Sequence, residues 1–201
     1  MSSNTFISHG STCIVPNVTL EKFRQKARKL KRESGISHTQ ALDQVAICNG
    51  FKHWHQVVES AKLTSVTENA FFNGLIIAMD VKDGLEFKDT KNRFVEDFQF
   101  CYLVEQKFFD LYANAEDEDG IKHNTYMSNE EMKQIVDEDM MNYIFFRFEG
   151  EVLPEDIPSV LKIVEECSYW PPMYFWFKGQ FIDFFELPTE DFGDGISEIR
   201  F

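Results

Sequence analysis

Two breaks that contain glycine divide the first third of the chain into short helices. Apolar residues recur at steps of three and four between Leu20 and Leu30, which is the spacing of one helix face. Gly35 is a suitable C-terminal stop for this helix, and Asn49-Gly50 ends the next one. The pattern predicts three helices, over residues 19–34, 37–48 and 52–62, with Thr19 and Ser37 as the caps of the first two.

The second and third of these helices have the spacing of a helix-turn-helix. In such a motif the first helix has a small residue where the second crosses it, and the turn contains glycine. Ala46 and Gly50 stand at this spacing, and Val57 supplies a later apolar contact. With Val57 buried, the third helix would present to DNA the polar side chains of Lys52, His53 and Gln56.

Charge is distributed unevenly along the 201 residues. Residues 1–65 carry nine Lys/Arg and four Asp/Glu, a net charge of +5, whereas residues 66–201 carry 11 and 30, a net charge of −19. The first predicted helix holds seven cations within eleven residues. Such a helix could neutralise the phosphates of a nucleic acid without reading its base sequence. The candidate nucleic-acid-binding residues are Lys22, Lys26, Arg28, Lys29, Arg32, Lys52, His53 and Gln56. The alternatives are that the two parts bind each other, or that the acid only confers solubility.

The remainder of the chain alternates predicted strands and helices. A hydrophobic content of 43% is ample for a packed core. We expect strands near 71–81 and 142–150, a helix within 91–114, helices from Ser128 and over 156–168, and a hairpin that turns at Lys178-Gly179. The order favours an α+β fold with a partly antiparallel sheet. The expected organisation is a flexible tail over 1–18, a basic three-helix module over 19–63, a linker near 63–70 and an acidic α+β domain over 70–201, with a further edge strand from ISEIRF at the end.

An aromatic run, SYWPPMYFWF, occupies residues 168–177. Only alternate residues of a strand face one side of a sheet, so some of these rings must lie on the second face. Either helices cover both faces, or the rings form a surface for a protein partner, since aromatic residues are enriched at interface centres. The candidate partner-binding residues are Tyr169, Trp170, Tyr174 and Trp176.

No motif in the sequence indicates catalysis. His53 and His55 are two positions apart on a helix, about 200° around it, and cannot chelate one ion. Glycine loops that would hold phosphate are missing from the sequence, so we expect no catalytic residue, no cofactor and no metal. The weakest reading is an enzyme with a site near His123. Four cysteines without a CxxC pair, no signal peptide and no membrane span predict a cytoplasmic protein with reduced thiols.

Residues 37–54 read SHTQALDQVAICNGFKHW. With its flanks, residues 20–61, this segment resembles a short helical module of bacterial plasmid- or phage-borne proteins. In that module a Ser-His-x-Gln-Ala-Leu segment precedes an Ala-x-x-x-Gly-Phe-x-x-Trp element, and some of the proteins carry a glyoxalase-related domain after it. The resemblance implies a bacterial mobile element as the setting, and it implies no activity.

These observations favour a protein that binds and does not catalyse. We expect a nucleic-acid-associated regulator or antitoxin-like protein of a mobile genetic element, whose acidic domain holds a protein partner or a second protomer. The alternative is an acidic protein-binding inhibitor, of an anti-defence or nucleic-acid-mimic type. The oligomeric state stays open, with a dimer among the options.

Overall fold

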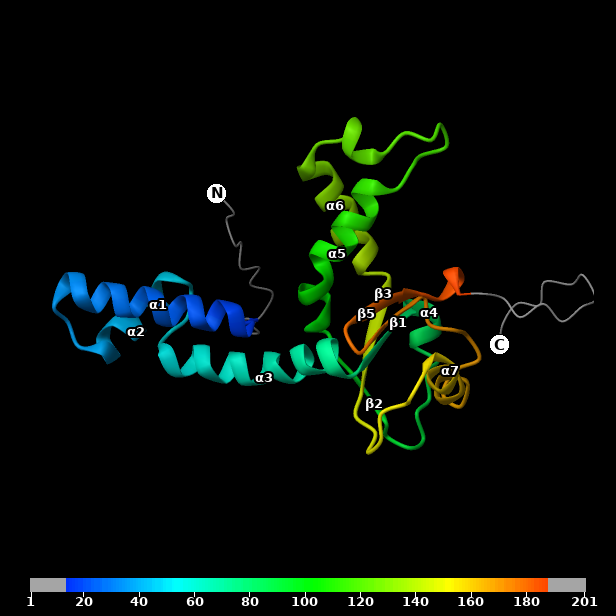
Figure 1. The fold of residues 1–201 in the computed structure, drawn as a ribbon, viewed down its shortest axis with the longest axis horizontal. Helices are drawn as coiled ribbons and strands as arrows, with labels where there is room; N and C mark the ends of the chain where they lie inside the picture. The colour runs from blue at the N-terminus through cyan, green and yellow to red at the C-terminus, as the bar shows by residue number, and fades with distance from the viewer. Residues whose placement is uncertain (1–13, 188–201) are drawn as a thin grey trace, which may run out of the picture. The chain divides into compact units, whose positions relative to one another are not determined.

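The computed structural model describes residues 14–187, and these divide into two compact units between Glu68 and Asn69 (Figure 1). Unit 1 contains α1 (Asn17–Ser34), α2 (His38–Cys48) and most of α3 (Trp54–Asn73). Unit 2 contains the end of α3 and all the strands described.

Unit 2 is built on a five-stranded antiparallel sheet with the strand order β2-β3-β1-β4-β5. The strands are β1 (Leu75–Asp80), β2 (Phe94–Glu96), β3 (Tyr143–Phe148), β4 (Tyr174–Phe177) and β5 (Gln180–Asp183). The helices are α4 (Val81–Gly84), α5 (Phe100–Asn114), α6 (Asn129–Met140) and α7 (Ile157–Glu165), with 3₁₀ turns η1 (His123–Thr125) and η2 (Phe184–Glu186). The predicted α+β class is confirmed, and every strand pair is antiparallel.

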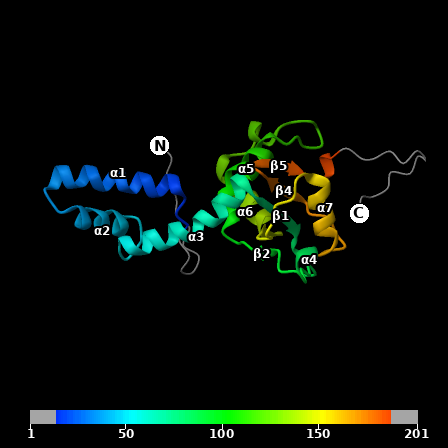
Figure 2. The ribbon, with the colours of Figure 1, turned by 60° about the horizontal axis from the view of Figure 1, so that its bottom comes forward.

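Both faces of this sheet are covered. Leu75 and Ile77 of β1 pack toward α7, whereas Ile76 and Ala78 pack toward α5 and α6. Figure 2 shows α7 on one side of β1 and β4, and α5 and α6 on the other. Successive side chains of β1 point to opposite faces of the sheet, and each face is covered by its own layer of helices. The whole strand is therefore buried.

The boundary between the two units falls within the linker predicted near residues 63–70, and this segment is helical, because α3 runs through it to Asn73. Residues 63–70 contain neither glycine nor proline, so nothing local ends the helix there. Contacts across unit 1 also hold this part of α3. The Val15 amide donates to Thr64 Oγ1 at 3.2 Å, and the Asn17 amide donates to the Glu68 carboxylate at 3.1 Å.

The predicted start of the first helix is also corrected. The helix α1 begins at Asn17 after Pro16, and Thr19 is buried and caps nothing. Val15 is fully buried, so the folded part of the chain begins before residue 19. The rest of the expected tail, residues 1–13, and the edge strand expected from ISEIRF lie outside the described residues.

Two elements of unit 2 were not predicted. Strand β2 occupies the start of the segment expected to be one long helix, so α5 begins only at Phe100. The one-turn helix α4 follows β1 directly, in a segment for which the sequence predicted no helix. Both elements are short, and their sequences contain no helical or strand period long enough to be detected.

Candidate nucleic-acid interface

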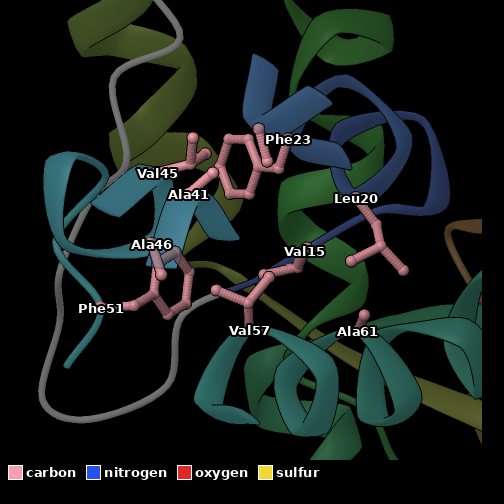
Figure 3. Close-up of a cluster of buried hydrophobic side chains, with 10 residues drawn as sticks. Val15, Leu20, Phe23, Ala41, Val45, Ala46, Phe51, Val57 and Ala61 are labelled. Carbon is pink, nitrogen blue, oxygen red and sulfur yellow. The ribbon is translucent and has the colours of Figure 1, made fainter. Parts of the chain in front are cut away.

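A small apolar core holds the three helices of unit 1 together. Figure 3 shows side chains from all three helices pointing toward one another. The ten buried residues are Val15, Leu20, Phe23, Ala27, Ala41, Val45, Ala46, Phe51, Val57 and Ala61. Because Leu20, Phe23 and Ala27 face this core, the remaining surface of α1 is left to solvent.

The connection between α2 and α3 has the helix-turn-helix features that the sequence indicated. Ala46 is fully buried, and Gly50 takes the left-handed conformation with φ +83°. The Phe51 amide donates to the Ala46 carbonyl at 3.0 Å and closes the turn. A further contact was not predicted: the Trp54 amide donates to Asp43 Oδ1 at 2.9 Å, so a side chain of α2 caps the first turn of α3.

All seven cations of α1 are exposed. Arg24 and Arg28 lie 3.6 Å from the Glu21 carboxylate, and Lys29 lies 3.8 Å from Glu33. Pairs this exposed contribute at most about 1 kcal/mol and leave the cations open to other anions. Among residues 14–187, four of the seven form no ion pair: Lys22, Lys26, Lys31 and Arg32.

Lys22, Lys26 and Lys29 are four and three positions apart, so they form one row along α1, which we call the lysine row. Lys26 lies at a pocket of about 430 Å³ between α1 and α2, whose floor includes Leu30 and Val45. Lys26, the middle residue of the lysine row, therefore borders the helix-turn-helix hairpin.

The hairpin offers fewer free groups for base reading than the sequence indicated. The Gln56 amide donates to His53 Nδ1 at 3.2 Å, and the Gln56 side chain accepts from the Lys52 amide at 2.8 Å. Two of the three predicted readers, His53 and Gln56, are thus engaged in capping α3. The Lys52 side chain is exposed and forms no ion pair with any other described residue.

The four aromatic residues predicted to bind a partner fall into two groups. Tyr169 and Trp170 are 77% and 46% exposed and pack edge to face, with ring centroids 5.1 Å apart. Tyr174 is half-buried, and Trp176 is only 1% exposed, within the α5/α6 face of the sheet. Of these four residues, only Tyr169 and Trp170 are exposed.

His123, near which an enzyme site was considered, is engaged in structure. His123 Nδ1 lies 3.0 Å from the Tyr112 carbonyl oxygen, and its ring packs on the Tyr112 ring at 4.4 Å. Burial raises the pKa of the Cys101 thiol to about 12 and that of Cys167 to about 11, with Asp89 adding to the latter, so both thiols stay protonated near neutral pH. No group of three His, Cys, Asp or Glu within residues 14–187 is placed to hold a metal ion.

Comparison of the chain with protein-family models, curated proteins and solved structures finds no match. The resemblance of residues 20–61 to the plasmid- and phage-borne module therefore stays a prediction. Over the described part of the chain, no helix has the length and apolar character needed to cross a membrane.

Proposed function

We propose that unit 1 binds nucleic acid through its phosphates, with the lysine row as the principal contact. The observation that carries this proposal is the exposure of all seven cations of α1, four of them outside any ion pair with the described residues. Phosphate contacts of this kind supply affinity that depends on salt and not on sequence.

The state of the hairpin favours binding that is largely independent of sequence. His53 Nδ1 and Gln56 Oε1 are engaged in capping α3, so base reading through these two atoms would require that cap to open. In this proposal the protein is a non-catalytic, nucleic-acid-associated regulator of a mobile element, and its acidic unit holds another protein.

The test is binding of the full-length protein to a mixed-sequence duplex DNA and to a single-stranded RNA, followed by fluorescence anisotropy across a salt series. Lys22→Glu/Lys26→Glu removes two cations of the lysine row that form no ion pair with the described residues. Each lost phosphate contact lowers the log–log salt slope on duplex DNA by about 0.9, so the slope is expected to fall by roughly 2. Affinity at low salt should fall at least tenfold.

Lys82→Glu/Lys162→Glu is the matched control, because both lysines are exposed in unit 2 and the change in net charge is the same. This variant should bind as the parent does if the contact is local to α1. Equal binding by the Lys22→Glu/Lys26→Glu variant, or no binding by the parent at low salt, would refute the proposal. Circular dichroism establishes that each variant is folded.

The acidic unit is proposed to hold a protein partner through Tyr169 and Trp170. Residues 66–201, which include this unit, have a net charge of −19, which favours a basic partner over a second copy of this chain. Light scattering is therefore expected to give the monomer mass of 23.5 kDa. A dimer that dissociates on Trp170→Ala would instead assign the aromatic pair to self-association.

A further inference from the structure

Unit 2 contains an open pocket of about 330 Å³ between α5, α6 and the sheet. Five of its lining residues are aromatic: Phe108, Tyr112, Tyr143, Tyr174 and Phe181. Three are acidic: Asp139, Asp183 and Glu186. The volume is within the range of small-molecule sites, and neither the proposed nucleic-acid contact nor the exposed aromatic pair accounts for this pocket.

The aromatic rings form a connected wall. The Phe108 ring stacks on Tyr143 with centroids 5.7 Å apart and meets the edge of Tyr174 at 5.4 Å. The Tyr174 ring lies 5.4 Å from Phe181. These rings come from α5, β3, β4 and β5, four elements that the sheet and its helical layer hold in place. The wall is therefore preformed.

The charges around the pocket have one sign. Asp139, Asp183 and Glu186 come from α6, β5 and η2, and none of them forms an ion pair within residues 14–187. Asp183 Oδ1 accepts from the Phe185 amide at 2.9 Å. Among the described lining residues none is basic, although Lys107 Nζ lies 4.8 Å from the centroid of the Phe181 ring. The pocket thus combines aromatic faces with three carboxylates that form no ion pair within residues 14–187.

Aromatic faces attract cations through the ring quadrupole, and most strongly cations that shed water easily, such as quaternary ammonium groups. Carboxylates at the rim add long-range attraction for the same sign of charge. A bare metal ion would need converging oxygen ligands, and residues 14–187 contain no such group. A neutral apolar molecule would leave the three carboxylates without a role.

We propose that this pocket binds a small alkylated ammonium ion. The aromatic wall would contact its methyl groups and its charge, and Asp139 and Glu186, both exposed, would neutralise it from the rim. The cation is either a free small molecule or the head of a methylated lysine side chain, which share this chemistry. The proposal stands independently of nucleic-acid binding by unit 1.

The test is calorimetric titration of the full-length protein with choline and with its uncharged isostere, 3,3-dimethylbutan-1-ol. Choline should bind at least tenfold more tightly than the isostere, because only choline engages the quadrupole and the carboxylates. A trimethyllysine amide, titrated in parallel, distinguishes the two sources: tighter binding than choline indicates a peptide ligand, and weaker binding a free one.

Asp139→Asn/Glu186→Gln removes two of the rim charges at exposed positions and should weaken choline binding about tenfold at low salt. Glu130→Gln/Glu138→Gln removes the same charge from exposed positions of α6 that do not line the pocket, and should bind choline as the parent does. Equal binding of choline and the isostere, an equal effect of the two variants, or no heat with choline at roughly 10 mM would overturn the proposal.

Discussion

Trp176→Ala is expected to lower the free energy of unfolding of unit 2 by about 4 kcal/mol. Trp176 is 1% exposed at the centre of the sheet face that α5 and α6 cover. Its ring meets those of Phe100 at 4.7 Å and Phe181 at 5.3 Å. Truncation removes the apolar burial and leaves a cavity that these rings can only partly fill, because the strand holds the backbone in place.

Urea denaturation followed by near-ultraviolet circular dichroism measures this loss, with unit 2 treated as its own transition. Trp170→Ala is the matched control, since Trp170 is 46% exposed, and its effect should stay within about 0.5 kcal/mol. If Trp176→Ala had an effect as small as that of Trp170→Ala, Trp176 would not be packed in the core of unit 2 as described. Because Phe181 lines the proposed cation pocket, Trp176→Ala should also weaken choline binding.

Asp89→Asn is expected to lower the free energy of unfolding of unit 2 by about 3 kcal/mol near neutral pH. The reason is that the Asp89 side chain is a buried carboxylate that accepts several hydrogen bonds. Its side chain is 6% exposed. It accepts from the amides of Phe94 at 2.7 Å and Lys91 at 3.2 Å, and also from the Arg93 amide. The Arg93 guanidinium lies 3.4 Å away, so the carboxylate organises the turn that leads into β2.

The pH dependence follows from the same contacts. Burial by itself would raise the pKa of Asp89, but the three amides and Arg93 together lower it. A carboxylate whose pKa is lower in the folded state than in the unfolded state stabilises the fold. This stabilisation is complete above the unfolded pKa of about 3.9, and it is lost as the pH falls through the pKa of the folded state. The difference in stability between the parent and Asp89→Asn should therefore be full at pH 7 and shrink below about pH 4.

Urea midpoints at a series of pH values measure this difference. Asp119→Asn serves as the control, because Asp119 is exposed in the acidic loop, and its effect should be within about 0.5 kcal/mol at every pH. A difference for Asp89→Asn that stays constant down to pH 3 would mean that the lost contacts do not depend on the charge of the carboxylate.

Local signals in the sequence predicted those features that neighbouring residues determine. Ser37 and Ser128 cap their helices, as expected, and both caps are reciprocal boxes. Gly35 ends α1 with φ +66°, and Lys178-Gly179 turns the hairpin with φ +52° and +80°. Each of these depends on a hydrogen bond or a backbone conformation that spans only a few residues, which is why one short stretch of sequence is enough.

The exposure of the α1 cations was predictable for a related reason. Once Phe23 and Ala27 face the core, the helical period alone turns Lys22 and Lys26 outward. The same reasoning missed Asp43, whose contact with the Trp54 amide joins two helices. It also could not detect that the side chains of His53 and Gln56 accept from the Gln56 and Lys52 amides at the start of α3.

Tertiary structure alone decided the rest. Strand order, and with it the burial of Trp176 but not Trp170, depends on pairings such as Ile76 with Trp176, a hundred residues apart. The proposed cation pocket likewise draws its walls from α5, α6, β3, β4 and β5. The sequence by itself determined most of the helices, the caps at Ser37 and Ser128, the turns at Gly35 and Lys178-Gly179 and the surplus of charge, because these arise between near neighbours. It could not determine which distant residues meet. A period of two or 3.6 shows that one face of a strand or helix is buried, but it does not show which other element covers that face.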